Sequence, residues 1–336
     1  MYASVIIPTY NRRKILERTL QGLANQSVSS DGFEIVVVDD CSSDDTDSFM
    51  KRTCESFSNL TYIRHAENQG RVITRNDGVV AARGELIIFL DDDNFPGHDF
   101  VNSHIEYHAQ NGDEHIVVMG NVRFADEVIA GSNFARYLQS RYLGFRSENE
   151  KAKLDYSNLP ARCLGTLNCS MRREDLLAIG MLDTSFRYYG GEDEYLGYCL
   201  SRAGLRIIFG EQARSVHRDD LSIQRYKSKV VETTRAGYRV ILGKGNEYFE
   251  QTQVRFLLPV DWRKDSLRRI AIKRWIKILL NPLTVFLLER WAILSDGYSW
   301  LYFQPVYRLL TAGWGLSGFR SSRQEIGLVT YGKTAT

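Results

Sequence analysis

The chain has 336 residues, of which 43% are hydrophobic and 25% charged, so it can bury a sizeable core and is long for a single domain. Its 43 basic and 41 acidic residues leave a net charge of +2, which is too small to attract a nucleic acid partner. The five cysteines are scattered without a C-x-x-C spacing, which indicates neither a disulfide framework nor a zinc site. The N-terminus has no basic segment followed by a long apolar run, so we expect a first strand there and a cytoplasmic protein.

Short apolar runs alternate with helical patterns through the first 90 residues. Strands are expected at 3–7, 34–38, 60–64 and 85–90, and helices at 12–24, after the helix-start residues 43–46, and at 71–82. Because these strands are largely apolar and are separated by helices, they predict an α/β fold with a mostly parallel sheet covered on both faces.

Polar residues follow three of the expected strands, as Pro8-Thr9-Tyr10, Asp39-Asp40 and Asp91-Asp92-Asp93. In open α/β sheets, ligands bind at the carboxyl ends of the strands. Tyr10 could stack on a nucleobase or be an ordinary loop aromatic. Asp39 and Asp40 could accept hydrogen bonds from a base or a ribose, or cap the next helix. The three adjacent acids favour a Mg²⁺ or Mn²⁺ site, and the alternative is a solvated acidic turn.

Four segments have the order and spacing of a known family. They are residues 5–12, 36–44, 68–70 with 75–78, and 89–93, the last of which looks like a D-x-D motif. The pattern resembles the family 2 glycosyltransferases, which use nucleotide sugars. The resemblance implies the GT-A fold, with a Rossmann-like sheet flanked by helices.

The resemblance also implies the parts of a donor site. It places Pro8, Thr9, Tyr10 and the acidic pair Asp39-Asp40 at the donor nucleotide, Arg75 at the phosphates, Asp91 or Asp92 at the ribose or sugar, and Asp93 on a metal. Three positions depart from the family pattern. Cys41 replaces the usual glycine, Thr74 replaces the usual alanine, and Asn94 stands where many relatives carry another acid.

A second group of candidate residues lies in residues 189–196, which resemble the family's G-E-D-x-E-L motif. Acids at a helix start are kept ionised by the helix dipole, although they can also be simple capping residues. The resemblance assigns Asp193 as the general base, and it places Glu192 in support of the loop or of the acceptor sugar. It places His217 in the metal shell. By contrast, we expect His104 and His108 on a solvated helix face, since no zinc motif surrounds them.

The resemblance implies a metal-dependent inverting glycosyltransferase that uses Mn²⁺ or Mg²⁺ and a nucleotide sugar, with a UDP sugar preferred because UDP is the commonest donor nucleotide in the family. Its acceptor would be a saccharide or a lipid-linked saccharide in polysaccharide or glycoconjugate synthesis. One alternative is a catalytically silent nucleotide-sugar-binding partner protein, although the base Asp193 is present. Another is a nucleotidyltransferase, which would need a glycine-rich basic loop after the first strand, where residues 8–11 have none.

The composition changes near residue 224. We expect a catalytic domain at 1–223, with a nucleotide-binding half at 1–94 and an acceptor half at 95–223, followed by a mainly helical extension at 224–336. The extension holds all five tryptophans and a basic amphipathic stretch, which could lie at the inner face of a membrane or pack on the catalytic domain. A protein interface, including a homo-oligomer, is a further alternative. The apolar run 276–288 is too short to span a bilayer.

Overall fold

A computed structural model describes residues 2–146, 152–218, 222–245 and 247–321. The first half alternates strands and helices in the order β1 (Ala3–Thr9), α1 (Arg13–Ala24), β2 (Phe33–Asp39), α2 (Thr46–Ser56), β3 (Leu60–Arg64), α3 (Arg71–Ala81), β4 (Leu86–Leu90), β5 (Asn94–Pro96), α4 (Phe100–Gln110) and β6 (Ile116–Phe124). There follow α5 (Asp126–Ala130), α6 (Asn133–Gln139), β7 (Asn168–Arg172), α8 (Arg173–Ala178), α9 (Glu192–Arg202) and β8 (Arg206–His217).

The strands form one mixed sheet in the order β3-β2-β1-β4-β7-β6-β8-β5. The first four strands of that order are parallel, as expected, because each is joined to the next in the chain by a helix. The strand β7 then runs antiparallel to both β4 and β6, and β5 runs antiparallel to β8. The carboxyl end of β4 and the end of β8 therefore lie on the same side of the molecule, where the expected site residues are found.

Alternating side chains of β1 build two separate cores. Val5 and Ile7 pack with Leu16 and Leu20 of α1 on one face. Ile6 joins the core on the other face, to which α3 and α9 also contribute. This is the two-residue period of a strand buried on both sides, and it explains why the run is almost entirely apolar, with Ser4 as its one polar position between Ala3 and Ile7.

The expectation that His104 and His108 lie on a solvated face was wrong. Both side chains on α4 are buried, at 0% and 1% exposed. They bond to the same hydroxyl of Ser170 on β7, and His104 also bonds to Asn168. Burial lowers the pKa of His104 to about 3 and that of His108 to about 4, so both imidazoles are neutral at pH 7 and act as hydrogen-bonding partners in this buried polar network. A pair at i and i+4 gives the same sequence pattern whether its helix face meets water or a sheet.

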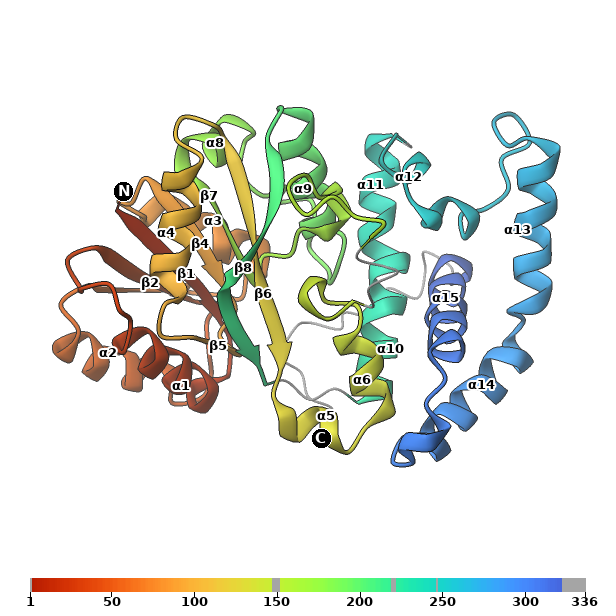
Figure 1. The fold of residues 1–336 in the computed structure, drawn as a ribbon, viewed down its shortest axis with the longest axis horizontal. Helices are drawn as coiled ribbons and strands as arrows, with labels where there is room; N and C mark the ends of the chain where they lie inside the picture. Colours follow the sequence, from red (N-terminus) through yellow and green to blue (C-terminus); the bar gives the residue numbers. More distant parts are fainter. Residues whose placement is uncertain (1, 147–151, 219–221, 246, 322–336) are drawn as a thin grey trace.

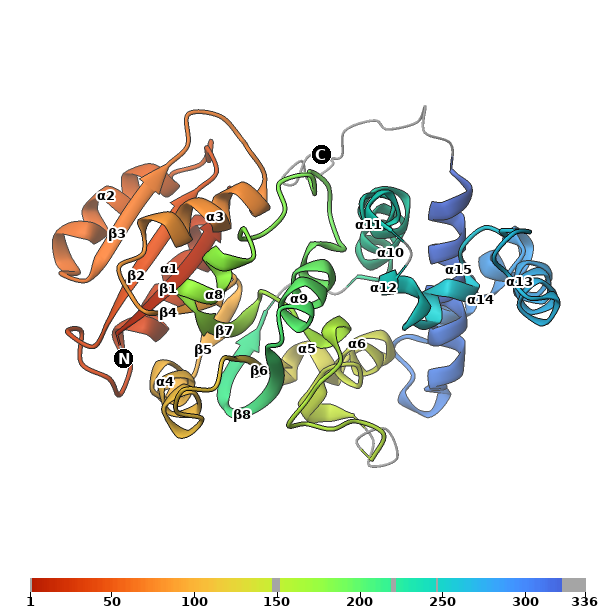
Figure 2. The same ribbon diagram turned by 90° about the horizontal axis from the view of Figure 1, so that it is seen from above.

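The chain after β8 is helical, as expected from its sequence. It comprises α10 (Ile223–Glu232), a π-helical turn (Thr233–Gly237), α11 (Tyr238–Lys244), α12 (Glu247–Glu250), α13 (Leu267–Leu279), α14 (Pro282–Ser295) and α15 (Gln304–Arg320). Figures 1 and 2 show α10, α11 and α15 in the middle of the molecule, between the sheet and the outlying α13 and α14. A third core, which includes Phe134, Tyr307 and Trp314, joins α6 to α10, α14 and α15. This core fixes the helical part against the sheet-bearing part.

The apolar run near residue 280 is split into two helices. The side chain of Asn281 caps α14 by accepting hydrogen bonds from the backbone N–H groups of Leu283 and Thr284, and Pro282 occupies the first turn. The helices α13 and α14 therefore meet at a 56° bend. In the described part of the chain, no individual helix has the length and apolar character needed to cross a bilayer, although the bent pair reaches that threshold when taken together.

Candidate active site

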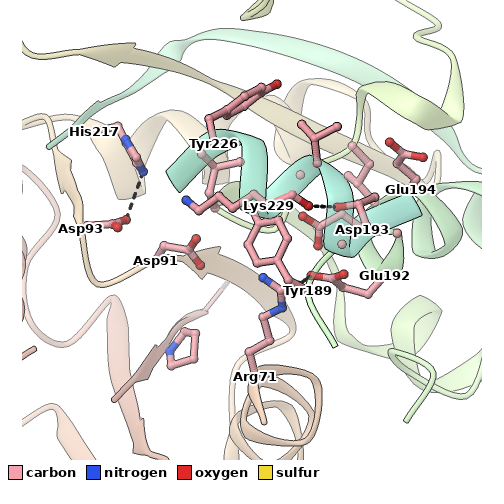
Figure 3. Close-up of a pocket in the computed structure, with 18 of the residues that line it drawn as sticks. Arg71, Asp91, Asp93, Tyr189, Glu192, Asp193, Glu194, His217, Tyr226 and Lys229 are labelled. Carbon is pink, nitrogen blue, oxygen red and sulfur yellow. Dashed lines mark hydrogen bonds and ion pairs between the residues drawn. The ribbon is translucent and has the colours of Figure 1, made fainter. Parts of the chain in front are cut away.

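A cavity of about 540 Å³ opens at the carboxyl ends of β1 and β4, between the sheet and the helices α9 and α10. Figure 3 shows acidic and basic side chains from both sides pointing into it. The sequence-predicted residues that line it are Pro8, Thr9, Tyr10, Asp40, Arg75, Asp91, Asp92, Asp93, Glu192, Asp193 and His217. Segments almost 210 residues apart therefore meet at one place, and of the predicted residues only Asp39 is not in the lining.

The acidic pair at the end of β2 braces two loops. Asp39 is fully buried and accepts hydrogen bonds from the backbone and hydroxyl groups of Ser42, at 2.8 and 2.5 Å, and from Tyr62. Asp40 accepts hydrogen bonds from the backbone N–H groups of Gln69 and Gly70, each at 2.8 Å. Asp39 thus holds the turn after β2, whereas Asp40 holds the loop before α3 and also borders the cavity.

The backbone at Cys41 explains why glycine is usual there in the family that the sequence resembles. Its φ is +66°, in the left-handed region that glycine enters without steric cost. The turn is held by Asp39 on one side and by a hydrogen bond from the Cys41 thiol to the Ala66 carbonyl on the other. The left-handed backbone conformation is therefore present at Cys41, although this position has a cysteine in place of the usual glycine.

Each of the three acids after β4 has a basic partner. Asp91 pairs with Arg75 at 2.6 Å, and the guanidinium of Arg12 reaches Asp92 at 3.1 Å and Asp93 at 2.5 Å. Asp92 also accepts a hydrogen bond from the hydroxyl of Thr9 at 2.8 Å. Burial raises the pKa of Asp92 to about 7, with repulsion from Asp93 adding to it and Arg12 opposing it. Asp92 and Asp93 are thus buried and Asp91 is half-buried, and all three are paired with arginine side chains, so the segment is not a solvated turn.

Arg75 has N–H groups to spare for a ligand. Its side chain is 4% exposed, and Nη2 donates to Asp91, but Nε and Nη1 are buried without a hydrogen-bond partner. Burial lowers the pKa of this guanidinium, but the charges of Asp91, Asp193 and Glu192 together raise it above its usual value. A fixed cation with unused donors suits a phosphate group.

Asp93 and His217 meet where a cation could bind. The pairing of β5 with β8 sets His217 opposite Asn94, so its Nε2 lies 3.4 Å from Oδ1 of Asp93. That oxygen and Nδ1 of His217 are buried without a hydrogen-bond partner. Burial raises the pKa of Asp93, but His217 and Arg12 outweigh it and hold the pKa below its usual range. A carboxylate oxygen suits Mn²⁺ or Mg²⁺, and an imidazole nitrogen is a common ligand of metal ions in proteins.

The protein alone does not complete a metal shell. Within the residues that the structure describes, no three histidine, cysteine or acidic side chains converge closely enough to hold an ion. A cation at Asp93 and His217 would therefore need further oxygen ligands from a bound molecule or from water. This is the usual arrangement for small divalent ions that bind with phosphates.

The second group of acids begins α9, directly after two glycines in the left-handed region. Gly190 and Gly191 have φ of +90° and +92°, and they turn the chain so that the first turn of α9 points into the cavity. Oδ1 of Asp193 accepts a hydrogen bond from Thr166 at 2.7 Å, and Glu192 pairs with Arg71 at 2.7 Å. Burial raises the pKa of Glu192, with Arg71 opposing it.

Several cavity residues were missed by sequence reasoning. The guanidinium of Arg71 lies 4.1 Å from the ring centroid of Tyr189, and the ammonium of Lys229 lies 5.4 Å from the same ring. Tyr226, Lys229 and Thr233 project from one side of α10 and its π-helical turn at helical spacing. That periodicity is visible in the sequence, but nothing in it says that this side faces the site. The cavity wall therefore continues past residue 223.

The described residues 232–245 and 247–248 also hold the loop that carries the second acid group. Glu232 accepts a hydrogen bond from the backbone N–H of Tyr189 at 2.9 Å. Glu194 accepts hydrogen bonds from the hydroxyls of Tyr238 at 3.2 Å and Tyr248 at 2.6 Å. At the π-helical turn, Gly237 packs so closely that an added Cβ would lie 1.7 Å from the carbonyl oxygen of Gly190. We refer to this segment as the loop seat.

Comparison with known proteins identifies the family. The model of Glycosyl transferase family 2 matches residues 4–175, which is 172 of the 336 residues. Chondroitin synthase from Escherichia coli is 30% identical over 240 residues, which cover 64% of this chain and 34% of that protein. The uncharacterized glycosyltransferase YfnE from Bacillus subtilis (strain 168) is 28% identical over 289 residues, which cover 73% of this chain and 71% of that protein. The chain thus spans about a third of one relative and most of the other.

A solved structure supports the fold. Mannosyltransferase PcManGT from Pyrobaculum calidifontis, in complex with GDP-Man and Mn²⁺, superposes with a TM-score of 0.61 at 17% identity, covering 94% of this chain and 85% of that one. The GT-A fold expected from the sequence is thereby confirmed, as is the sheet flanked by helices. With the family model matching over half of its length, the chain belongs to glycosyltransferase family 2.

Proposed function

We propose that the chain transfers a sugar from a nucleotide-sugar donor to a hydroxyl group of an acceptor, with inversion at the anomeric carbon. The observation that carries this proposal is that Arg75 and Asp91–Asp93 line one side of a cavity whose other side holds Asp193. Family membership supports the class of reaction. We favour a UDP sugar because the sequence resembles a family in which UDP is the commonest donor nucleotide, while the GDP-Man of the solved neighbour makes GDP sugars the second choice.

The donor would lie across the carboxyl ends of β1 and β4. In this proposal Pro8, Thr9, Tyr10 and Asp40 surround the base, and Asp91 or Asp92 contacts the ribose or the sugar. Asp39 would act indirectly, by holding the turn beside them. The two unused N–H groups of Arg75 would bind the diphosphate. Asp93 and His217 would hold Mn²⁺ or Mg²⁺, which when bound neutralises charge on the diphosphate.

The acceptor hydroxyl would approach from the side of α9. Thr166 holds Oδ1 of Asp193, which leaves Oδ2 to take the proton of the acceptor hydroxyl. The acceptor oxygen then forms a bond to the anomeric carbon while the bond from that carbon to the diphosphate oxygen breaks. The negative charge passes to the leaving nucleoside diphosphate, where the fixed guanidinium of Arg75 stabilises it. Glu192 and Arg71 would orient the loop or contact the acceptor sugar.

The acceptor we propose is a saccharide or a lipid-linked saccharide, in the synthesis of a polysaccharide or a glycoconjugate. The synthase among the relatives supports this choice. A homo-oligomer stays a prediction, as does a cytoplasmic location with contact to the inner face of a membrane. The division into a catalytic domain at 1–223 and an extension from 224 stays a prediction too, and in our proposal the extension contributes a wall of the acceptor site.

A donor screen tests the proposal. The full chain is mixed with Mn²⁺ and a panel of UDP, GDP and dTDP sugars, and release of nucleoside diphosphate is measured with and without a chelator. We expect release from one donor class, loss of release with chelator, and recovery when excess Mn²⁺ is added. The absence of both turnover and binding across the whole panel would overturn the proposal. Binding without turnover for any acceptor would favour the silent nucleotide-sugar-binding protein instead.

A further inference from the structure

The outward sides of α13 and α14 expose a set of large apolar side chains. These are Leu267, Trp275, Ile278 and Leu279 on α13, and Leu283, Phe286, Leu287 and Leu294 on α14, each more than half exposed. We call this set the outer face. Its members recur at helical spacing, so they lie on one side of each helix. Soluble proteins rarely expose so many large apolar side chains side by side, and such a patch usually marks an interaction surface.

The opposite sides of the same helices are already packed. Ala292 of α14 is fully buried in the third core, and Val285 packs against Gly313 of α15, where an added Cβ would lie 2.5 Å from a Val285 methyl group. On α13, Ile270 and Lys273 are the buried positions. The outer face is therefore the side that points away from the rest of the molecule, as the rim position of both helices in Figures 1 and 2 indicates.

Charges are sorted by sign around the outer face. Within the described residues 261–321, the exposed charged side chains are all basic, namely Arg263, Lys264, Arg268, Arg274, Arg290, Arg308 and Arg320. None of the four acids of the same stretch is exposed, and each is bonded to protein, Asp261 by accepting a hydrogen bond from the backbone N–H of Arg263. Asp265 pairs with Lys273 at 2.6 Å, Glu289 pairs with Lys227 at 2.9 Å, and Asp296 accepts a hydrogen bond from the backbone of Phe134. Across the described residues 261–321, the exposed charge that a partner would meet is therefore positive.

Aromatic side chains extend the surface at both of its ends. Trp262 is 66% exposed, and the guanidinium carbon of Arg274 lies 5.1 Å from the centroid of the Trp262 ring. Trp300, which follows α14, is 79% exposed. Tryptophan and arginine side chains are the groups that settle at the boundary between acyl chains and lipid headgroups. We propose that the outer face rests in the interface of a membrane that contains anionic lipid, with α13 and α14 lying along its surface.

This orientation connects the membrane to the cavity. The helix α15 packs on α14 with one side, and its Thr311 borders the cavity. The cavity wall also includes Tyr226 and Lys229 of the neighbouring α10. An acceptor carried by a lipid would thus have its anchor and its reacting hydroxyl separated by a thin layer of helices. That last step rests on the proposed function, whereas the membrane contact itself does not.

Vesicle binding tests the inference on the full chain. The protein is sedimented with vesicles of phosphatidylcholine alone, or of equal parts phosphatidylcholine and phosphatidylglycerol, at low and high salt. We expect strong binding only with phosphatidylglycerol, and weaker binding at high salt. The double variant Trp275→Glu/Phe286→Glu should lose it. Arg268→Gln/Arg274→Gln should bind roughly tenfold or more weakly, since each cation adds to the attraction by anionic lipid.

A charge-matched control separates this surface from a general effect of added acids. Val80→Glu/Leu177→Glu places the same two charges at exposed apolar positions of α3 and α8, and it should bind vesicles like the wild type. Circular dichroism and donor turnover in solution, which should be unchanged in all three double variants, report folding and activity independently of binding. Equal sedimentation of wild type and Trp275→Glu/Phe286→Glu would overturn the inference. A dimer in sedimentation velocity that this variant dissociates, without vesicle binding, would overturn it in favour of a second copy of the chain.

Discussion

The two sides of the cavity are built in different ways. In our proposal the donor side is built mostly from the first 94 residues, where Asp40 and Asp91–Asp93 follow parallel strands of one sheet and Arg75 lies on the adjoining α3, and His217 joins it from the end of β8. The acceptor side is a glycine-hinged loop around Asp193, held by the loop seat from the helical part of the chain. A sheet fixes strand ends directly, whereas a loop takes its position from whatever it packs on. The donor side should therefore tolerate changes in the helical part that the acceptor side does not.

The largest expected effect separates chemistry from donor binding. Asp193→Asn keeps the size and the hydrogen bond to Thr166 but cannot take a proton, so transfer should fall by about 10²–10⁴-fold. Donor affinity, measured by calorimetry with Mn²⁺, should stay within about twofold of wild type, because in our proposal Asp193 contacts the acceptor. The exposed Asp126→Asn is the matched control and should be silent. Transfer that survives in Asp193→Asn would move the base to another residue.

The reverse pattern is expected on the donor side. Asp93→Ala removes the oxygen that lies 3.4 Å from His217, so added Mn²⁺ should no longer tighten donor binding. We expect a loss of more than about 100-fold in donor affinity, since even outer-shell changes at metal sites cost up to that much. Affinity measured in chelator gives the baseline, which the substitution should leave close to that of wild type. If Mn²⁺ still strengthens donor binding in this variant, the cation is held elsewhere.

The sequence predicted the strand-end residues of the cavity better than the loop around Asp193 and the helices that support it. The strand ends were found because apolar runs closed by acids are local patterns, and the family resemblance supplied their roles. Arg12, Arg71 and the loop seat were missed because their function depends on which helix face packs where. The histidines of α4 show the same limit, since spacing alone placed His104 and His108 in water whereas the structure buries both against β7. The boundary at residue 224 marks a change in composition but does not mark the edge of the cavity.

Acid pH should destabilise the fold around both sides of the cavity together. The strand β7, against which His104 and His108 of α4 pack, lies in the sheet between β4 and the pair β6 and β8, and β8 carries His217. Their folded pKa values are below the unfolded value of about 6.5, so their stabilisation is complete above that pH and is lost as the pH falls towards about 4. At pH 5 the free energy of unfolding should therefore be lower than at pH 8 by roughly 2 kcal/mol for each histidine. Urea titrations at pH 8 and pH 5 measure it.

The control for that experiment is His104→Asn, which replaces one titrating group by a neutral side chain that can still form hydrogen bonds. The difference in unfolding free energy between pH 8 and pH 5 should shrink by the share of one histidine. An unchanged difference would mean that other groups dominate the acid sensitivity.

The smallest effect tests the loop seat. Gly237→Ala would place a Cβ 1.7 Å from the carbonyl oxygen of Gly190 and should shift the loop that carries Asp193. We expect transfer to fall about tenfold, since misplacement by a fraction of an ångström is costly in an active site, while donor binding is kept. Gly243→Ala on the same stretch of helix has nothing within 4 Å of its added Cβ, so it is the matched control. Equal transfer by the two variants would contradict a role for the seat.

The most direct test of the account is a crystal structure with the donor nucleotide sugar and Mn²⁺ bound. We predict the ion between Asp93 and His217, the diphosphate on Nε and Nη1 of Arg75, and the anomeric carbon facing Asp193. An ion bound at Glu192 or Asp193, or a diphosphate that does not contact Arg75, would contradict the division of the cavity into a donor side and an acceptor side.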